Sequence, residues 1–122
     1  MKSLRISTLV SASFLLLLPL LPTDAQRVSM TTGNTLLDAC ESKPEFQQAF
    51  CMGYIAGVSD SANLDSAAHK DRRRVCTPAD VTNGQTMDVV IKHLKEHPEN
   101  RQSNATILIV TSLANAFPCS NH

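Results

Sequence analysis

The segment CTPADVTNGQTMDVVIKHLKEHPENRQSNATILIVTSLANAFPC, residues 76–119, predicts two helices joined by a short turn. Thr82 and Gln85 have the spacing of a capping box, so the first helix is expected to begin there. Its apolar residues recur at helical spacing: Met87, Val90, Ile91 and Leu94. The pattern stops at His97, because Pro98 disfavours helical geometry at the residue before it.

A second helix is expected over residues 102–117, and Pro118 ends it. Its apolar stripe is Ile107, Val110, Ala114 and Phe117, broadened by Leu108, Ile109 and Leu113. A helix this apolar is expected at the centre of the domain. Because a short turn joins the two helices, they should be antiparallel neighbours. Antiparallel packing would bring Cys76, just before the first helix, close to Cys119, just after the second.

The residues before this pair predict two more helices and no strand. A short helix is expected over residues 34–41, with Asn34 as its N-cap. A longer helix is expected over residues 44–64, with Pro44 in its first turn and Ser42 as its cap.

The four cysteines fit this arrangement as two disulfides. Cys40 closes the short helix and Cys51 lies early in the next, so these two should be close. Cys40–Cys51 and Cys76–Cys119 are therefore favoured over the two other pairings. The prediction is an all-α, compact four-helix domain, with one short and three longer helices, stapled by two disulfides.

The helix expected over residues 44–64 carries a small residue at every fourth position: Ala49, Gly53, Gly57 and Ser61. Each glycine inside a helix costs about 1 kcal/mol relative to alanine. Close approach of another helix along this small-residue ladder would compensate. That helix belongs either to the same chain or to a second subunit, and the second case makes the protein a homodimer.

Residues 1–25 have the features of a secretory signal peptide. Lys2 and Arg5 precede an apolar stretch, and Ala25 is the expected cleavage point. An uncleaved membrane anchor is disfavoured because the apolar stretch is short and Pro19 interrupts it. The helical domain would then span residues 26–122, with no membrane association after signal cleavage. An even number of cysteines in an exported chain also favours disulfides.

Loss of residues 1–25 leaves nine of the 11 Lys and Arg residues and ten of the 11 Asp and Glu residues. The resulting net charge, near −1, gives no electrostatic reason for binding nucleic acid. One local basic run remains, formed by Arg72, Arg73 and Arg74. It is either a solvated loop or an anchor for an acidic partner surface.

The sequence HLKEH, residues 93–97, matches an inverted zinc-peptidase motif. Three observations disfavour a zinc site. No third ligand is evident, Pro98 takes His97 out of helical geometry, and His93 lies off the apolar stripe. The chain also has no phosphate-binding loop and no C-x-x-C pair. We therefore predict no enzymatic activity, no metal and no cofactor.

Four stretches together resemble the Rap/Tai family of Gram-negative bacteria, known for type VI secretion amidase immunity proteins. They are TGNTLLDAC (32–40), FCMGYIAGVSD (50–60), CTPADVTNGQTMDVVIKHLKEHPENR (76–101) and ANAFPC (114–119). The resemblance implies a small all-helical protein of the periplasm, often a dimer. It also implies that the protein binds a peptidoglycan-cleaving amidase effector and blocks its active site without chemistry of its own.

The surface that would contact such an effector is a hypothesis based on shape. An inhibitor of a cleft enzyme usually presents a rigid projecting loop, and the turn between the last two helices fits this description. Its residues are His97, Pro98, Glu99, Asn100 and Arg101. The alternative is a helix-hairpin turn with no further role. The basic run at residues 72–74 is the second candidate, where charge would mainly raise the association rate.

Three other function classes compete with the inhibitor. A periplasmic stress protein, similar to a chaperone, would need groups that titrate on acidification and expose the core. A carrier of an apolar ligand would need an internal cavity. An enzyme is the least favoured class, for the reasons given above.

Overall fold

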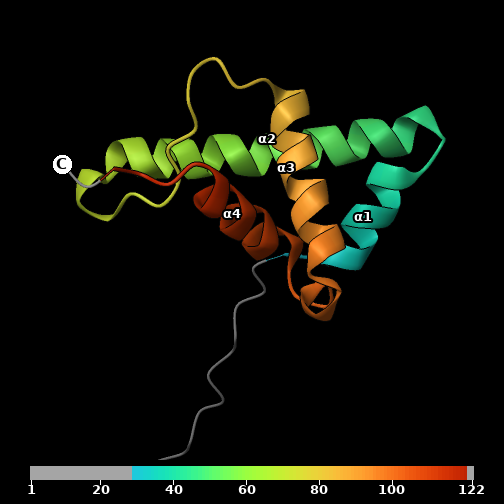
Figure 1. Ribbon diagram of the computed structural model, residues 1–122. Helices are drawn as coiled ribbons and strands as arrows, with labels where there is room; N and C mark the ends of the chain where they lie inside the picture. Colours follow the sequence, from blue (N-terminus) through green and yellow to red (C-terminus); the bar gives the residue numbers. More distant parts are fainter. Residues whose placement is uncertain (1–28, 121–122) are drawn as a thin grey trace, which may run out of the picture.

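The computed structural model describes residues 29–120, and in this range the chain is all-α, as predicted (Figure 1). Its α-helices are α1 (Gly33–Glu41), α2 (Glu45–Ala68), α3 (Asn83–Glu96) and α4 (Ala105–Ala116). Two short 3-10 turns follow α2 and α3, namely η1 (Lys70–Arg72) and η2 (Pro98–Asn100). One short helix of 9 residues and three of 12 to 24 residues confirm the predicted set. The expected signal peptide lies outside the described residues.

Helix α2 runs the length of the molecule, α3 and α4 pack against it, and α1 closes one end (Figure 1). The side chains that fill the core are almost fully buried: Leu36, Ile55, Val75, Val90, Leu94, Ile109 and Leu113. Each such side chain contributes about 1.5–3 kcal/mol when it leaves water. Within residues 29–120, no helix is both long and apolar enough to cross a membrane.

Helix α4 was expected at the centre of the domain, but it packs only one side against the other helices and leaves Ile107, Thr111 and Asn115 exposed. Ile109 and Leu113 are completely buried on the side that faces the other helices. The predicted stripe is wrong at Ile107, which is 47% exposed. Ile107 and Ile109 lie two residues apart on a helix and therefore point in nearly opposite directions. Only one of the two can face the core.

Both predicted disulfides are confirmed. The Cα atoms of Cys40 and Cys51 lie 5.0 Å apart, and those of Cys76 and Cys119 lie 5.1 Å apart. Beside the second bond, the N–H of Cys76 donates to the carbonyl oxygen of Phe117 at 3.0 Å. The bond and this hydrogen bond tie the segment before α3 to the segment after α4.

Of the predicted N-caps, one was correct and two were not. The Thr82–Gln85 capping box of α3 is present, with Thr82 N–H donating to Gln85 Oε1 at 2.8 Å. Helix α1 is capped by Thr32, whose Oγ1 accepts the N–H of Thr35. The prediction of Asn34 as N-cap is therefore wrong.

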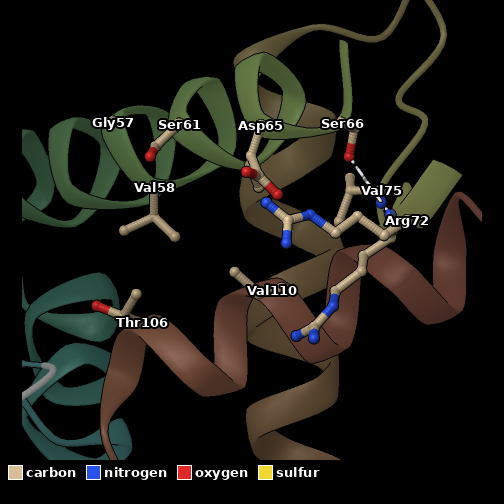
Figure 2. A pocket seen from close by; sticks show the side chains of 11 residues that line it. Gly57, Val58, Ser61, Asp65, Ser66, Arg72, Val75, Thr106 and Val110 are labelled. Carbon is tan, nitrogen blue, oxygen red and sulfur yellow. Dashed lines mark hydrogen bonds between the residues drawn. The ribbon is translucent and has the colours of Figure 1, made fainter. Parts of the chain in front are cut away.

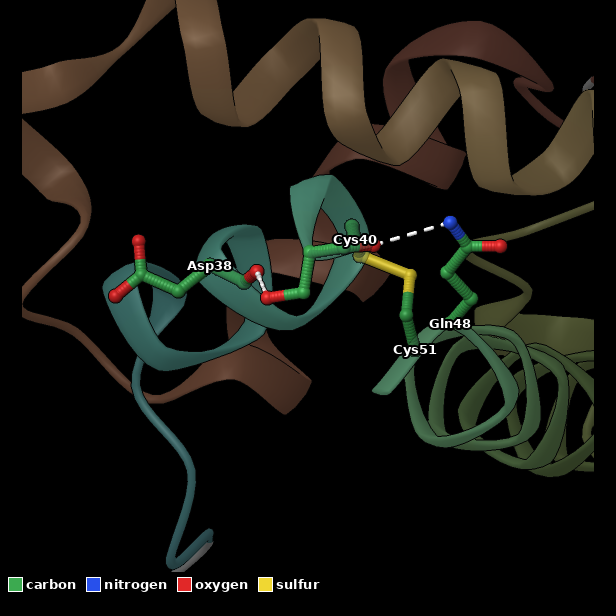
Figure 3. The surroundings of a disulfide bond; sticks show 5 residues. Asp38, Cys40, Gln48 and Cys51 are labelled. Atoms are coloured by element: carbon green, nitrogen blue, oxygen red, sulfur yellow. Dashed lines mark hydrogen bonds between the residues drawn. A yellow bond between two sulfur atoms is a disulfide. The ribbon is translucent and has the colours of Figure 1, made fainter. Parts of the chain in front are cut away.

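Ser42 caps the end of α1 and not the start of α2. Its hydroxyl donates to the carbonyl oxygen of Asp38 at 2.6 Å, while its own carbonyl accepts from Gln48 Nε2 at 3.0 Å (Figure 3). Helix α2 begins at Glu45 after Pro44, with no side-chain cap. The Ser42 hydroxyl can cap only one of the two helices that it joins. It caps the C-terminal end of α1.

The small-residue ladder of α2 is exposed, although Gly57 and Ser61 also border a cavity between α2 and α4. Gly53 and Gly57 are exposed, and a Cβ added at either would meet nothing within 4 Å. The alternative that a helix of the same chain packs along these two glycines is therefore wrong. The same face carries Phe46 at 70% exposure and Leu64 at 71%.

Candidate partner-binding surfaces

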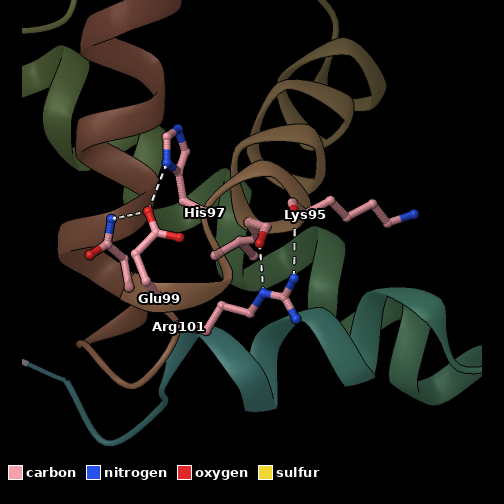
Figure 4. Close-up of polar contacts among 6 residues, drawn as sticks. Lys95, His97, Glu99 and Arg101 are labelled. Atoms are coloured by element: carbon pink, nitrogen blue, oxygen red, sulfur yellow. Dashed lines mark hydrogen bonds and ion pairs between the residues drawn. The ribbon is translucent and has the colours of Figure 1, made fainter.

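The turn between α3 and α4 projects from one end of the molecule (Figure 1). Pro98, Glu99 and Asn100 are exposed, whereas His97 is partly buried. Glu99 Oε1 lies 3.1 Å from His97 Nδ1 and accepts a hydrogen bond from Asn100 Nδ2 at 3.4 Å (Figure 4). His97, Glu99 and Asn100 thus form a small polar cluster around one carboxylate.

Glu99 carries a stable negative charge at the tip of this turn. A hydrogen bond from backbone N–H lowers the pKa of Glu99, and a hydrogen bond with His97 lowers it further. The carboxylate is therefore ionised at neutral pH. The turn presents one fixed charge to solvent.

Arg101 has a structural role that the sequence did not indicate. Its Nε donates to the carbonyl oxygen of Leu94 at 2.7 Å, and Nη2 donates to that of Lys95 at 3.4 Å (Figure 4). These carbonyls belong to the last turn of α3 and have no partners within the helix. Arg101 therefore closes the end of α3, and only four of the five predicted turn residues are free for a partner.

The turn is also fixed on the side of α1. Gly33 N–H donates to the Ser103 carbonyl at 3.1 Å, and Asn34 N–H donates to the Arg101 carbonyl at 3.0 Å. A Cβ at Gly33 would lie only 2.5 Å from Leu108 Cδ1 and 3.0 Å from the Arg101 carbonyl oxygen. Glycine at position 33 is therefore what allows α1 and the turn to approach so closely.

His93 and His97 do not form a helical pair of ligands. Helix α3 ends at Glu96, and His97 has φ −122° and ψ 61°, outside helical geometry, as Pro98 predicted. The two rings lie 4.6 Å apart. Partial burial lowers the pKa of His93, and the neighbouring His97 lowers it further. Among residues 29–120, no group of three or more His, Cys, Asp or Glu could hold a metal ion.

The predicted basic run at residues 72–74 does not form one cluster. All three arginines are exposed, but η1 ends at Arg72 and Arg73 is extended, with φ −59° and ψ 136°. Successive side chains of an extended segment point to opposite sides. Accordingly Arg72 and Arg74 line one cavity, of about 500 Å³, and Arg73 lines another, of about 470 Å³.

A buried serine holds this arginine segment against α2. Ser66 is 5% exposed, and its Oγ accepts the backbone N–H groups of Arg74 at 3.4 Å and Val75 at 3.3 Å (Figure 2). Val75 is itself buried in the core. The segment is therefore positioned by a polar contact and an apolar one, neither of which the sequence pattern revealed.

The two candidate surfaces lie at opposite ends of the molecule (Figure 1). The α3–α4 turn lies beside the start of α1, whereas η1 follows the far end of α2. A partner with a small binding surface could not contact both the α3–α4 turn and the arginine segment. The two surfaces must be considered separately.

The sequence matches a known protein family. A family model described as Rap1a immunity proteins matches residues 32–119. The matched segment begins at the N-cap of α1 and ends at Cys119, so it includes all four helices and both disulfides. Neither the curated proteins nor the solved structures gave a match.

Proposed function

Since the chain belongs to the Rap1a immunity protein family, we propose that it binds a peptidoglycan amidase effector of a type VI secretion system and blocks its active site. The match over residues 32–119 is the observation that carries this proposal. In it, the protein works in the periplasm after cleavage of its signal peptide. It performs no chemistry itself, because excluding substrate from the effector is sufficient.

The α3–α4 turn is the proposed contact. Pro98, Glu99 and Asn100 project into solvent, while hydrogen bonds to α1 and the Arg101 cap hold the backbone beneath them. A turn that is already ordered loses little conformational entropy on binding. This rigidity is what an element inserted into an active-site cleft requires. The arginines at residues 72–74 are the second proposed contact, acting mainly on the association rate.

The outer face of α2 is proposed as a homodimer interface. Phe46 and Leu64 are largely exposed there, and Phe50 is 43% exposed between them. Gly53 and Gly57 lie between these apolar side chains, on a face that also carries Asp60, and would let a second α2 approach closely. Sedimentation of the mature protein tests the idea. The Gly53→Leu chain should sediment as a monomer if the face is the interface, whereas an unchanged dimer would place the interface elsewhere.

A pull-down from periplasmic extract, with the oxidised mature protein as bait and mass spectrometry to identify what binds, tests the function. We expect recovery of a cell-wall amidase, followed by its inhibition at a near-stoichiometric ratio. Recovery of many unrelated unfolded proteins would instead support the chaperone class. A purified amidase that binds but keeps its full activity would rule out occlusion.

The contact itself is tested by the double variant Glu99→Ala and Asn100→Ala. Arg101 is left in place, because its removal would disturb the end of α3. We expect affinity for the amidase to fall by about tenfold or more. The matched control is Asp88→Ala with Asn115→Ala, which removes one carboxylate and one amide from exposed positions outside the turn. Equal affinities of the two double variants would exclude the turn as the contact.

A further inference from the structure

The cavity between α2, α4 and the arginine segment combines an apolar floor with two positive charges (Figure 2). Its apolar walls come from Val58 and Ala62 of α2, Val75, and Val110 of α4. We propose that this cavity binds a small organic carboxylate with an aliphatic body. The inference concerns a site outside the α3–α4 turn and does not depend on the proposed effector.

The charges of this cavity favour an anion. Within residues 29–120, neither Arg72 nor Arg74 takes part in an ion pair. The one acidic residue of the lining is Asp65, and its Oδ1 is already engaged by His69 Nδ1 at 2.9 Å. The lining therefore carries two guanidinium groups and one carboxylate, which leaves an excess of positive charge. A carboxylate is the anion whose two oxygens match the paired N–H donors of arginine.

The apolar floor selects against a fully hydrated anion such as phosphate. Val58, Ala62 and Val110 offer no donor or acceptor from their side chains, so the ligand must bring an aliphatic part to cover them. A volume of about 500 Å³ suits a small molecule with a short chain. The carboxylate would lie between the two arginines, and the chain would follow the valines toward Thr106.

The arginines are held near this position before any ligand arrives. The hydrogen bonds from Arg74 and Val75 N–H to the buried Ser66 Oγ fix the backbone that carries them (Figure 2). The extended geometry at Arg73 then places residues 72 and 74 on the same side. Binding would then have to order the two arginine side chains but not the backbone that carries them, which limits the entropy loss.

Hexanoate is the probe for this site, and the mature oxidised protein is titrated with it while amide shifts are followed by NMR. We expect saturable shifts at Val58, Ala62 and Val110, with a dissociation constant of about millimolar order. Acetate should bind more weakly because it lacks the aliphatic chain. Hexylammonium, which has the chain but the opposite charge, should give no saturable shift. Absence of saturable shifts with hexanoate would overturn the proposal.

Three variants assign the interaction to the two arginines. Arg72→Gln with Arg74→Gln should weaken hexanoate binding by about tenfold or more, because charge-assisted hydrogen bonds are lost. Arg73→Gln is the control from the same segment: it removes one positive charge where the double variant removes two, and it faces the other cavity. Ala62→Leu should reduce binding by filling the floor while leaving all three arginines. If Arg73→Gln changed the binding free energy by half as much as the double variant, a nonspecific charge effect would replace the proposed site.

Discussion

Replacing Gly53 with alanine is expected to stabilise the folded chain. Gly53 lies inside α2, it is exposed, and a Cβ at this position would meet no atom within 4 Å. The substitution therefore removes the backbone entropy that glycine loses on folding and introduces no clash. The expected gain in the free energy of unfolding is about 0.8–1 kcal/mol. Gly57→Ala has the same basis and should add a similar gain.

Gly33→Ala is the matched control, with the opposite expected sign. Here the new Cβ would lie 2.5 Å from Leu108 Cδ1 and 3.1 Å from Arg101 Cα. The leucine side chain can move, but the backbone of Arg101 is held by hydrogen bonds, so the strain cannot fully relax. We expect a loss of about 1–3 kcal/mol, as is typical of overpacking.

Urea denaturation followed by far-UV circular dichroism measures both changes, at protein concentrations where the chain is monomeric and with the disulfides intact. A change of 1 kcal/mol should move the thermal midpoint by about 4–8 °C in a domain of this size. A lower free energy of unfolding for Gly53→Ala would refute the placement of the Gly53 face of α2 in solvent. Stabilisation by Gly33→Ala would refute the close approach of α1 to the turn.

Three further predictions concern the disulfides, the buried serine and His93. Loss of Cys76–Cys119, which closes a loop of 43 residues, should destabilise the chain by about 4 kcal/mol. Loss of Cys40–Cys51, which closes a loop of 11 residues, should cost about 3 kcal/mol. Denaturation of the two variants in which both cysteines of one bond are replaced by serine measures the difference. Ser66→Ala should cost about 1–3 kcal/mol and speed amide exchange at Val75, because two backbone donors lose their acceptor. Since burial lowers its pKa, His93 should titrate below 6.5 by NMR. Its contribution to stability is complete above the unfolded pKa and is lost as the pH falls through the folded pKa, so His93→Gln should reduce the loss of stability on acidification below pH 6.5. A normal His93 titration would contradict this.

Sequence patterns predicted helix ends correctly where the residue has one dominant structural role. The capping box at Thr82 and the break at Pro98 were predicted because they depend on residues only a few positions apart. The disulfide pairing followed from antiparallel packing of helices joined by a short turn. Ser42 was assigned to the wrong helix because its hydroxyl had two competing partners close in sequence, and only the folded geometry selects between them.

The candidate surfaces were less accessible to sequence analysis. Arg101 was placed among exposed turn residues, but it reaches back seven residues to Leu94, and no local rule describes that contact. The run of arginines suggested one basic patch, yet the extended backbone at Arg73 divides it between two cavities. The exposure of Gly53 depends on which side of α2 the other helices pack against.

The amino-acid sequence alone indicated the helical segments, the capping box at Thr82, the end of α3 before Pro98 and the favoured cysteine pairing, because these follow from short-range sterics, hydrogen bonding and chain connectivity. Tertiary packing decides which side of each helix is buried and which is exposed to solvent. It buries Ile109 and leaves Ile107 in solvent, directs Arg101 into α3, and opens a cavity beside Arg72. These outcomes depend on residues distant in the sequence, whose mutual positions are set by the packing of complete helices.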